Sequence, residues 1–266
     1  MSPLETIQEH CRQLRLTSLV QAVPEALTQA RQQDWSLENF LLYLLEQEVS
    51  QRQERRVARL LSQARLPPAK TLAQFDQTRL PLRLRRQLPG LIEGQFIDQA
   101  HNILIFGRPG TGKTHLAAAL AHEWLQRGYP VFFTPTFKLV DALLRAKRDY
   151  ALEPELKRLD RFAVLILDDF GYVQQSREEM EVLFTFLAER YERRSVVITS
   201  NLIFSQWDQV FKDPLTTAAA IDRVVHHSHI LEFGAEMTSL RAEAAAQRQL
   251  LELGQDAPGP TAPPQI

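Results

Sequence analysis

The chain has 266 residues, of which 44% are hydrophobic and 24% charged, and its formal net charge is −1. This composition predicts a soluble globular protein of one large or two small domains, and no apolar run approaches the roughly 18 residues that span a bilayer. The single cysteine, Cys11, excludes an internal disulfide, and the first residues lack the basic-then-apolar pattern of a secretion signal, so we expect a cytoplasmic protein.

Residues 1 to 66 are expected to form an all-helical N-terminal domain, because apolar residues recur there at helical spacing and show no strand-like alternation. Pro24 predicts a break or kink in the first half of this domain. A stronger helix is expected to begin after Ser36, a candidate N-cap, and to end before Pro67-Pro68.

Basic residues concentrate at the end of that domain and just beyond it. Residues 50 to 90 contain ten Lys or Arg against two acidic residues, a net of +8, whereas residues 101 to 266 contain 18 basic and 21 acidic residues. Such a segment can neutralise DNA phosphates and release counterions, and a solvated helix face is the alternative interpretation. The candidate DNA-binding residues in this segment are Arg52, Arg55, Arg56 and Arg59.

Residues 67 to 100 are predicted to be a connector with short helical pieces, interrupted by Pro81 and Pro89-Gly90. From residue 101 to 250 the pattern changes to apolar strands alternating with helices, which predicts an α/β domain with a five-stranded parallel sheet flanked by helices. The expected strands are 103–106, 131–133, 164–167, 196–199 and 229–233, and the expected helices are 113–126, 137–148, 178–192 and 216–225. The proline-rich tail, 251–266, is expected to be disordered.

A phosphate-binding loop is predicted between the first strand and the first helix of this domain. The pattern G-x-x-x-x-G-K-[ST] is met by Gly107, Gly112, Lys113 and Thr114. The glycines let backbone N–H groups curl around phosphate oxygens, and the helix that follows adds its N-terminal partial charge. Lys113 is then expected to reach the β- and γ-phosphates, and Thr114 to hold Mg²⁺. The candidate ATP-binding residues of the loop are Gly107, Pro109, Gly110, Thr111, Gly112, Lys113 and Thr114.

Two later strands end in polar side chains, at the edge of a parallel sheet where ligands gather. The third strand ends in Asp168 and Asp169, which predicts Asp168 as a Mg²⁺ ligand and Asp169 as the group that orients the attacking water. Asn201 follows the fourth strand and is expected to lie beside the γ-phosphate. A polar turn without catalytic function is the alternative for both positions.

Taken in this order, these elements resemble an AAA+ ATPase, and more narrowly the IstB-like ATP-binding proteins, the helper ATPases of insertion-sequence transposition, which are similar to DnaC. The resemblance covers residues 5 to 250 and is carried by the segments 14–16, 44–48, 55–61, 102–107, 167–172, 200–201 and 220–227. It implies an AAA+ fold, hydrolysis of ATP with Mg²⁺, assembly into a homo-oligomer, and binding to double-stranded DNA and a transposase.

The resemblance also implies roles for further residues. Arg223 matches the arginine finger, which acts on ATP bound by a neighbouring subunit; a surface salt bridge is the alternative. Arg241 lies where the family often has a second sensing arginine, although Leu240 replaces the tyrosine of that motif. Asp169 stands where many AAA+ proteins have glutamate. A second basic cluster lies in a region that relatives often direct at nucleic acid, and comprises Arg145, Lys147 and Arg148.

The leading hypothesis is an ATP-dependent DNA-binding helper that recruits or regulates a transposase. A DnaC-like loader of a replicative helicase has the same chemistry and a different partner. A small-molecule P-loop kinase and a nucleotide-gated binding module without useful turnover are alternatives of other classes.

Overall fold

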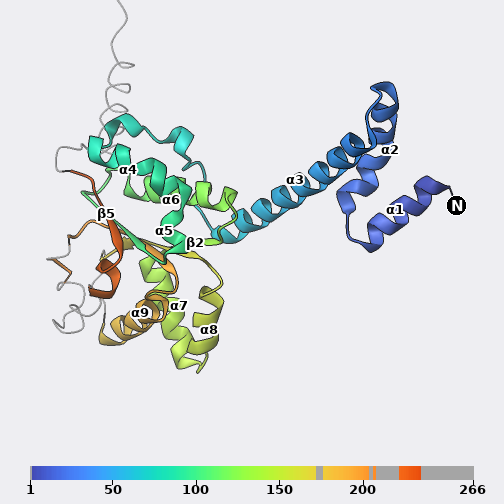
Figure 1. The fold of residues 1–266 in the computed structure, drawn as a ribbon. Helices are drawn as coiled ribbons and strands as arrows, with labels where there is room; N and C mark the ends of the chain where they lie inside the picture. Colours follow the sequence, from blue (N-terminus) through green and yellow to red (C-terminus); the bar gives the residue numbers. More distant parts are fainter. Residues whose placement is uncertain (1, 172–175, 204–205, 208–221, 235–266) are drawn as a thin grey trace, which may run out of the picture. The chain divides into compact units, whose positions relative to one another are not determined.

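The computed structural model describes residues 2–171, 176–203, 206–207 and 222–234 (Figure 1). The chain divides into two compact units, Met1–Ser62 and Gln63–Ile266, and each is described by itself. Among the helices within these described ranges, none combines the length and apolar character that crossing a bilayer requires.

The first unit is helical, as the sequence predicts. It contains α1 (Pro3–Gln13), α2 (Thr17–Gln32) and most of α3 (Leu37–Ala64). The Ser36 hydroxyl accepts a hydrogen bond from the N–H of Asn39 (3.2 Å), so it caps α3 as predicted. The apolar core of the unit includes Cys11, Leu19, Val23, Ala26 and Leu44. The only cysteine is therefore part of this core.

Of the break or kink expected at Pro24, a break does not occur, because α2 continues through this residue to Gln32. A proline in a helix leaves the carbonyl four residues earlier without its N–H donor. Here that carbonyl belongs to Val20, and it accepts a hydrogen bond from the Gln8 side chain of α1 (3.2 Å). The actual break comes earlier, at residues 14–16, where Arg15 has a φ of +58°.

The second unit begins with two short 3-10 helices (Leu72–Gln74 and Gln77–Arg79), then α4 (Leu82–Glu93) and α5 (Gln95–Asp98). Pro89 was expected to interrupt the chain, but it lies inside α4. A proline inside a helix costs about 3 kcal/mol. The buried leucines of α4 each contribute roughly 2 kcal/mol, enough to offset that cost; they are Leu84, Leu88 and Leu91.

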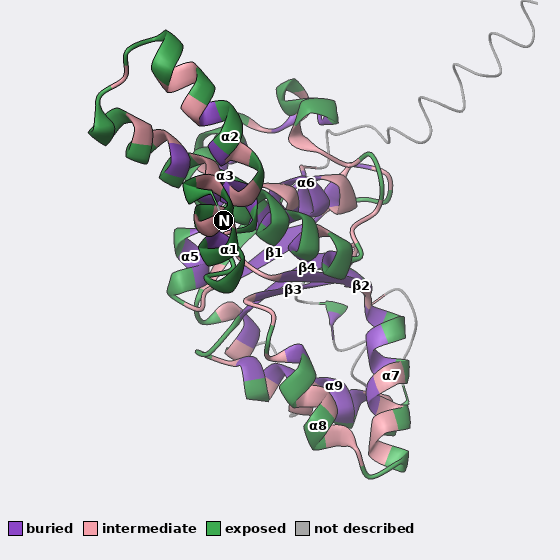
Figure 2. Ribbon diagram, turned by 90° about the vertical axis from the view of Figure 1, so that its right-hand side faces the viewer, coloured by how far each residue is buried: buried purple, intermediate pink, exposed green. Residues whose placement is uncertain are grey.

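The predicted five-stranded parallel sheet forms the centre of the second unit. Its strand order is β2-β3-β4-β1-β5, which places β4 between β1 and β3. The strands are β1 (Asn102–Phe106), β2 (Val131–Pro135), β3 (Val164–Phe170), β4 (Ser195–Ser200) and β5 (Ser228–Glu232). Nearly every residue of β1, β3 and β4 is buried, so these strands are covered on both faces (Figure 2).

Helices cover both faces of the sheet: α4 and α6 lie on one side, and α7, α8 and α9 on the other (Figures 1 and 2). The helices after β1 are α6 (Lys113–Gln126), α7 (Thr136–Arg148), α8 (Leu152–Leu159) and α9 (Arg177–Arg190). The sequence analysis missed α8, which has Pro154 in its first turn, where a helix tolerates proline. Of the helix predicted at 216–225, the structure describes 222–225, which are helical. The predicted tail lies outside the described residues.

Candidate functional site

The loop between β1 and α6 has the backbone conformation that a phosphate-binding loop needs. Gly110 and Gly112 have φ values of +81° and +101°, which side-chain-bearing residues rarely adopt. Position 107 has no room for a side chain, because a Cβ atom there would lie 2.6 Å from Cβ of Phe233. The N-terminus of α6 follows Gly112 directly, so its first N–H groups face the same loop.

The Lys113 side chain is 5% exposed and lies within this loop. Its ammonium group donates hydrogen bonds to the carbonyl oxygens of Gly107 (2.8 Å) and Arg108 (2.9 Å). It also donates to Oδ1 of Asn201 (2.6 Å), which follows β4. The structure thus brings together the lysine and the asparagine that the sequence analysis selected separately, 88 residues apart.

A second contact group joins the ends of β3 and β4 to the start of α6. The Thr199 hydroxyl donates a 2.6 Å hydrogen bond to Oδ1 of Asp168, which is buried. The Thr114 hydroxyl lies near enough to this carboxyl group to favour its charged form. Burial raises the pKa of Asp168, and the charge of Asp169 adds to that; the hydroxyls of Thr199 and Thr114 oppose the shift.

Asp168 and Asp169 are adjacent in sequence and differ in environment. The register between β3 and β4 shifts between Leu167 and Phe170, and Asp169 has a φ of +55°. This bulge buries Asp168 and leaves Asp169 exposed. The N–H of Asp169 donates to the Thr199 hydroxyl (3.0 Å), which holds the bulge in place. The two carboxylates can therefore perform different functions.

The residues at this edge of the sheet fit Mg²⁺ and a nucleoside triphosphate. Mg²⁺ prefers oxygen ligands, and a hydroxyl and a buried carboxyl group, those of Thr114 and Asp168, lie near each other here. The raised pKa of Asp168 shows that its negative charge lacks full compensation in the protein alone. A cation at this position would supply that compensation.

The sequence analysis missed two residues of the site. Thr199 bridges Asp168 and the bulge, and Lys70, in the connector, lies near enough for its charge to act on the pKa of Asp168. A hydroxyl at the end of a strand next to the acidic strand was a signal for Thr199. Lys70 carried no such signal, because only the fold brings the connector to this edge.

Arg223 does not lie at this site. The carbonyl of the next residue, Val224, accepts a 3.1 Å hydrogen bond from the side chain of Asn102, which begins β1. The phosphate-binding loop follows the other end of β1, so Arg223 and the loop lie at opposite ends of this strand. The Arg223 guanidinium packs over the Phe184 ring, 4.6 Å from its centroid. Among the described residues, no hydrogen-bond partner faces its buried Nη1. Arg241 lies outside the described residues.

The arginines predicted to contact DNA on α3 are exposed, and the bonds of Arg52 and Arg55 lie within the first unit. Arg52 donates to Glu48 (2.6 Å) and to the Arg15 carbonyl (3.2 Å). Arg55 donates to the hydroxyls of Thr17 and Ser18 at the start of α2. Arg55 therefore joins α3 to the start of α2, and Arg52 joins α3 to the turn that precedes α2. Exposed side chains on the same helix also include Arg56 and Arg59.

The second predicted cluster lies at the C-terminal end of α7. Arg145 forms an ion pair with Asp141 (2.7 Å), and Lys147 forms one with Glu181 (2.9 Å). Arg148 is exposed. The positive charge of this cluster is thus partly compensated by neighbouring carboxylates.

Comparison with known proteins places the chain in a family. The family model described as IstB-like ATP binding protein matches residues 9–246. An insertion-sequence ATP-binding protein of Sinorhizobium fredii is 41% identical over 236 residues, covering 88% of this chain and 79% of that protein. The ATP-binding protein of insertion sequence IS21 from Pseudomonas aeruginosa is 38% identical, with 88% of each chain covered.

Solved structures show the same fold at low sequence identity. DnaI aligns with a TM-score of 0.53 and 21% identity over 64% of this chain and 95% of that one. DnaA from Aquifex aeolicus, bound to AMPPCP, aligns with a TM-score of 0.52 and 19% identity over 73% of this chain and 58% of that one. The fold is that of the AAA+ P-loop ATPases, as predicted, and the extent of the family match shows that this chain is a member of the IstB-like ATP-binding proteins.

Proposed function

We propose that this protein is an ATP-hydrolysing helper of insertion-sequence transposition that assembles on double-stranded DNA and recruits or stimulates a transposase. The observation that carries the proposal is the convergence of Lys113 with Asn201, and of Thr114 with Asp168, at the carboxyl edge of one parallel sheet. The chain's membership of the IstB-like family supports the transposition context.

The chemistry at this site follows from the properties of the side chains. The loop amides and Lys113 would hold the phosphates, and Thr114 and Asp168 would hold Mg²⁺, which neutralises charge on the phosphate oxygens when it is bound. Lys113 now bonds to Asn201 and two loop carbonyls, so these bonds must loosen for its ammonium group to reach a phosphate. The exposed Asp169 carboxylate would orient the attacking water.

Arg223 acts, in this proposal, on a neighbouring subunit. The five residues of β1 separate the Asn102 end, where Arg223 lies, from the phosphate loop, a span of about 13 Å. This separation excludes Arg223 from its own loop and is compatible with a homo-oligomer in which one subunit's guanidinium faces its neighbour's phosphates. Charge developing on the transferred phosphoryl group would then be stabilised across the interface.

DNA binding is proposed to use exposed arginines of α3 and the end of α7. Arg59 and Arg56 on α3 and Arg148 on α7 keep exposed side chains. Each phosphate that such a side chain neutralises releases counterions, so affinity falls as salt rises. A residue whose charge is already partly compensated within the protein contributes less to DNA binding; such residues include Arg52, Arg55, Arg145 and Lys147.

The test is DNA binding at low and physiological salt, with ATP, ADP or no nucleotide. We expect ATP to strengthen binding to double-stranded DNA, and Lys113→Ala to lose that dependence because it loses ATP affinity at least about tenfold. Arg59→Glu should weaken binding to DNA. It should also reduce the slope of log affinity against log salt concentration by the equivalent of about 1 to 2 phosphate contacts. Arg31→Glu, which reverses a charge at another exposed site of the same unit, is the control.

Two results would contradict the proposal. One is an ATP affinity that Lys113→Ala leaves unchanged, and the other is DNA binding that is equal in all three nucleotide states. The partner is tested separately by co-purification with an insertion-sequence transposase. Capture of a replicative helicase in its place would establish the loader function.

A further inference from the structure

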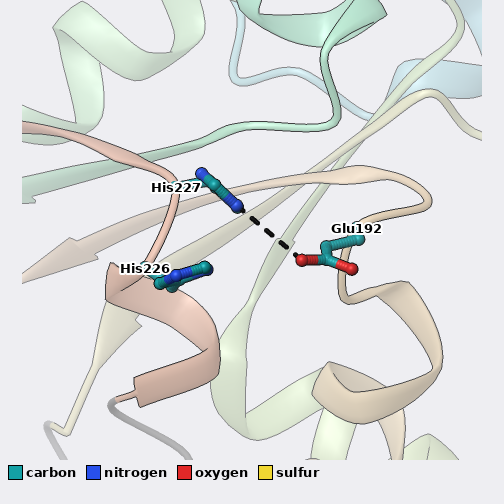
Figure 3. Close-up of side chains that lie close together, drawn as sticks. All are labelled: Glu192, His226 and His227. Atoms are coloured by element: carbon teal, nitrogen blue, oxygen red, sulfur yellow. Dashed lines mark ion pairs between the residues drawn. The ribbon is translucent and has the colours of Figure 1, made fainter.

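A second group of metal-ligating side chains lies away from the phosphate loop. Glu192 follows the end of α9, and His226 and His227 form the turn before β5 (Figure 3). One ligand atom from each residue lies within 4.8 Å of those of the other two. Nε2 of His227 is 3.7 Å from a carboxylate oxygen of Glu192. All three side chains are exposed, so an ion can reach them from solvent.

This cluster is distinct from the nucleotide site. The His227 carbonyl accepts a 2.7 Å hydrogen bond from the N–H of Asn102, which begins β1. The phosphate loop begins after Phe106, at the other end of the strand, about 13 Å away. The Mg²⁺ expected at Thr114 and Asp168 therefore cannot be shared with these histidines.

The donor atoms select a different class of metal ion. Two imidazoles and one carboxylate are a set that Zn²⁺ and similar transition-metal ions prefer, whereas Mg²⁺ prefers oxygen ligands alone. Bonds of about 2.0 to 2.2 Å in tetrahedral geometry place ligand atoms about 3.5 Å apart. The widest separation here, at most 4.8 Å, must shrink by about 1 Å, which exposed side chains can achieve by small torsional changes.

Neighbouring side chains already hold the two histidine rings. The Tyr191 hydroxyl lies 3.1 Å from Nδ1 of His226. The His101 ring stacks on that of His227, with centroids 5.1 Å apart and planes 5° from parallel. Metal-binding histidines are commonly oriented by such outer contacts, whose removal typically weakens affinity about 10- to 100-fold. These contacts reduce the rotational freedom that the rings would lose on binding an ion.

We propose that Glu192, His226 and His227 form a binding site for a divalent transition-metal ion of the zinc type, with water completing the coordination. The site joins the end of α9 to the segment that carries Arg223, which lies three residues before His226. A bound ion would restrain this segment, and with it the position of Arg223.

The experiment is a Zn²⁺ titration of the chain without a histidine tag, after chelator treatment, in buffer with Mg²⁺, by calorimetry. We expect one saturable Zn²⁺ site per chain. His227→Ala and Glu192→Gln should weaken it at least about tenfold, and Tyr191→Phe about tenfold through loss of the ring contact. His10→Ala, which removes an exposed histidine of α1, should leave the affinity within twofold, roughly the spread of such measurements.

Lys113→Ala distinguishes this site from the nucleotide site. The variant is expected to lose ATP affinity and to keep the Zn²⁺ affinity of the wild type. Loss of Zn²⁺ binding in Lys113→Ala would assign the ion to the phosphate loop and overturn the proposal. So would wild-type binding no tighter than that of His227→Ala, with circular dichroism showing the same fold for both chains.

Discussion

At the scale of single residues, the carboxyl group of Asp168 is expected to affect both the stability of the fold and the binding of Mg²⁺ with ATP. Its carboxyl group is buried and its pKa is raised by that burial, with Asp169 as an added negative neighbour. A raised folded-state pKa means that the folded chain holds this proton more tightly than the unfolded chain. The free energy of unfolding of the nucleotide-free chain therefore falls as pH rises from about 4 through the folded-state pKa of Asp168. The reason is that the folded chain is less stable when this carboxyl group is charged.

Asp168→Asn removes this buried charge and keeps an oxygen for the Thr199 hydroxyl. We expect the nucleotide-free variant to have a higher Tm than the wild type at pH 7, and a smaller difference at pH 4, where the wild-type carboxyl is protonated. The same change should weaken Mg²⁺-dependent ATP binding at least about tenfold, since a carboxylate ligand is lost. Thermal unfolding at both pH values and a nucleotide titration with and without Mg²⁺ measure these effects.

A lower Tm for Asp168→Asn at pH 7 would contradict the view that the charged carboxyl is a cost to the folded chain. Asp169→Asn is the matched control, because its side chain is exposed and changes no buried charge. It should raise Tm less than Asp168→Asn does, because it removes only a neighbouring negative charge, and it should lower the rate of hydrolysis.

How much of this site the sequence predicts depends on how far apart along the chain the contacting residues lie. The loop residues Gly107 to Thr114 act through a local backbone pattern, so the pattern alone predicted them. Thr199 acts through a hydrogen bond to β3, and that bond requires knowing that β3 and β4 are neighbours. Glu192 and His227 also meet only through the fold, since they precede different strands.

At the scale of elements, Arg190 joins α9 to the sheet. Its side chain is 2% exposed, and its two terminal nitrogens donate to four backbone carbonyls. Those carbonyls belong to Leu159, Phe162, Ala163 and Ser195. Burial lowers the pKa of Arg190 to about 9, so the group stays charged at neutral pH, and its hydrogen bonds to carbonyl oxygens are charge-assisted.

Arg190→Met keeps the apolar stem and removes all four hydrogen bonds. We expect it to lower the free energy of unfolding by about 3 kcal/mol or more, because buried carbonyl groups lose their donors. Arg193→Met, at the end of the same helix region, removes an arginine whose side chain is 59% exposed and should cost less than about 1 kcal/mol. Urea unfolding of the three chains provides the comparison, and equal costs for the two variants would show that the buried bonds contribute little.

The elements themselves were predicted best where periodicity and burial agree. The limits of α6 were predicted to the residue, because Gly112 and a run of alanines and leucines mark them. The helix continues through Pro24 without a break, and Gln8, from another helix, satisfies the carbonyl that the proline leaves without a donor. A local rule cannot include a partner supplied by tertiary packing.

At the scale of the whole molecule, the separation of Arg223 from its own phosphate loop has a consequence for assembly. If each site is completed by a neighbour, a chain that lacks the arginine and a chain that lacks the lysine carry defects in different sites. Arg223→Ala should keep ATP affinity near that of the wild type and lose at least about tenfold in hydrolysis rate, because the arginine is needed only for charge that develops in the transition state. Lys113→Ala should lose both properties.

Mixing these two inactive variants tests the shared site directly. A Lys113→Ala subunit still offers Arg223 to a neighbour, and an Arg223→Ala subunit still binds ATP, so mixed oligomers contain some sites with both groups. Random mixing in equal amounts restores up to about a quarter of the wild-type rate, the fraction of interfaces with the productive order, if each interface acts alone. The measurement is phosphate release on DNA as the ratio of the two chains is varied, with Lys113→Ala,Arg223→Ala mixed with wild type as the control for subunit exchange. A mixture no more active than its components, although that control shows exchange, would place the whole catalytic site within one chain.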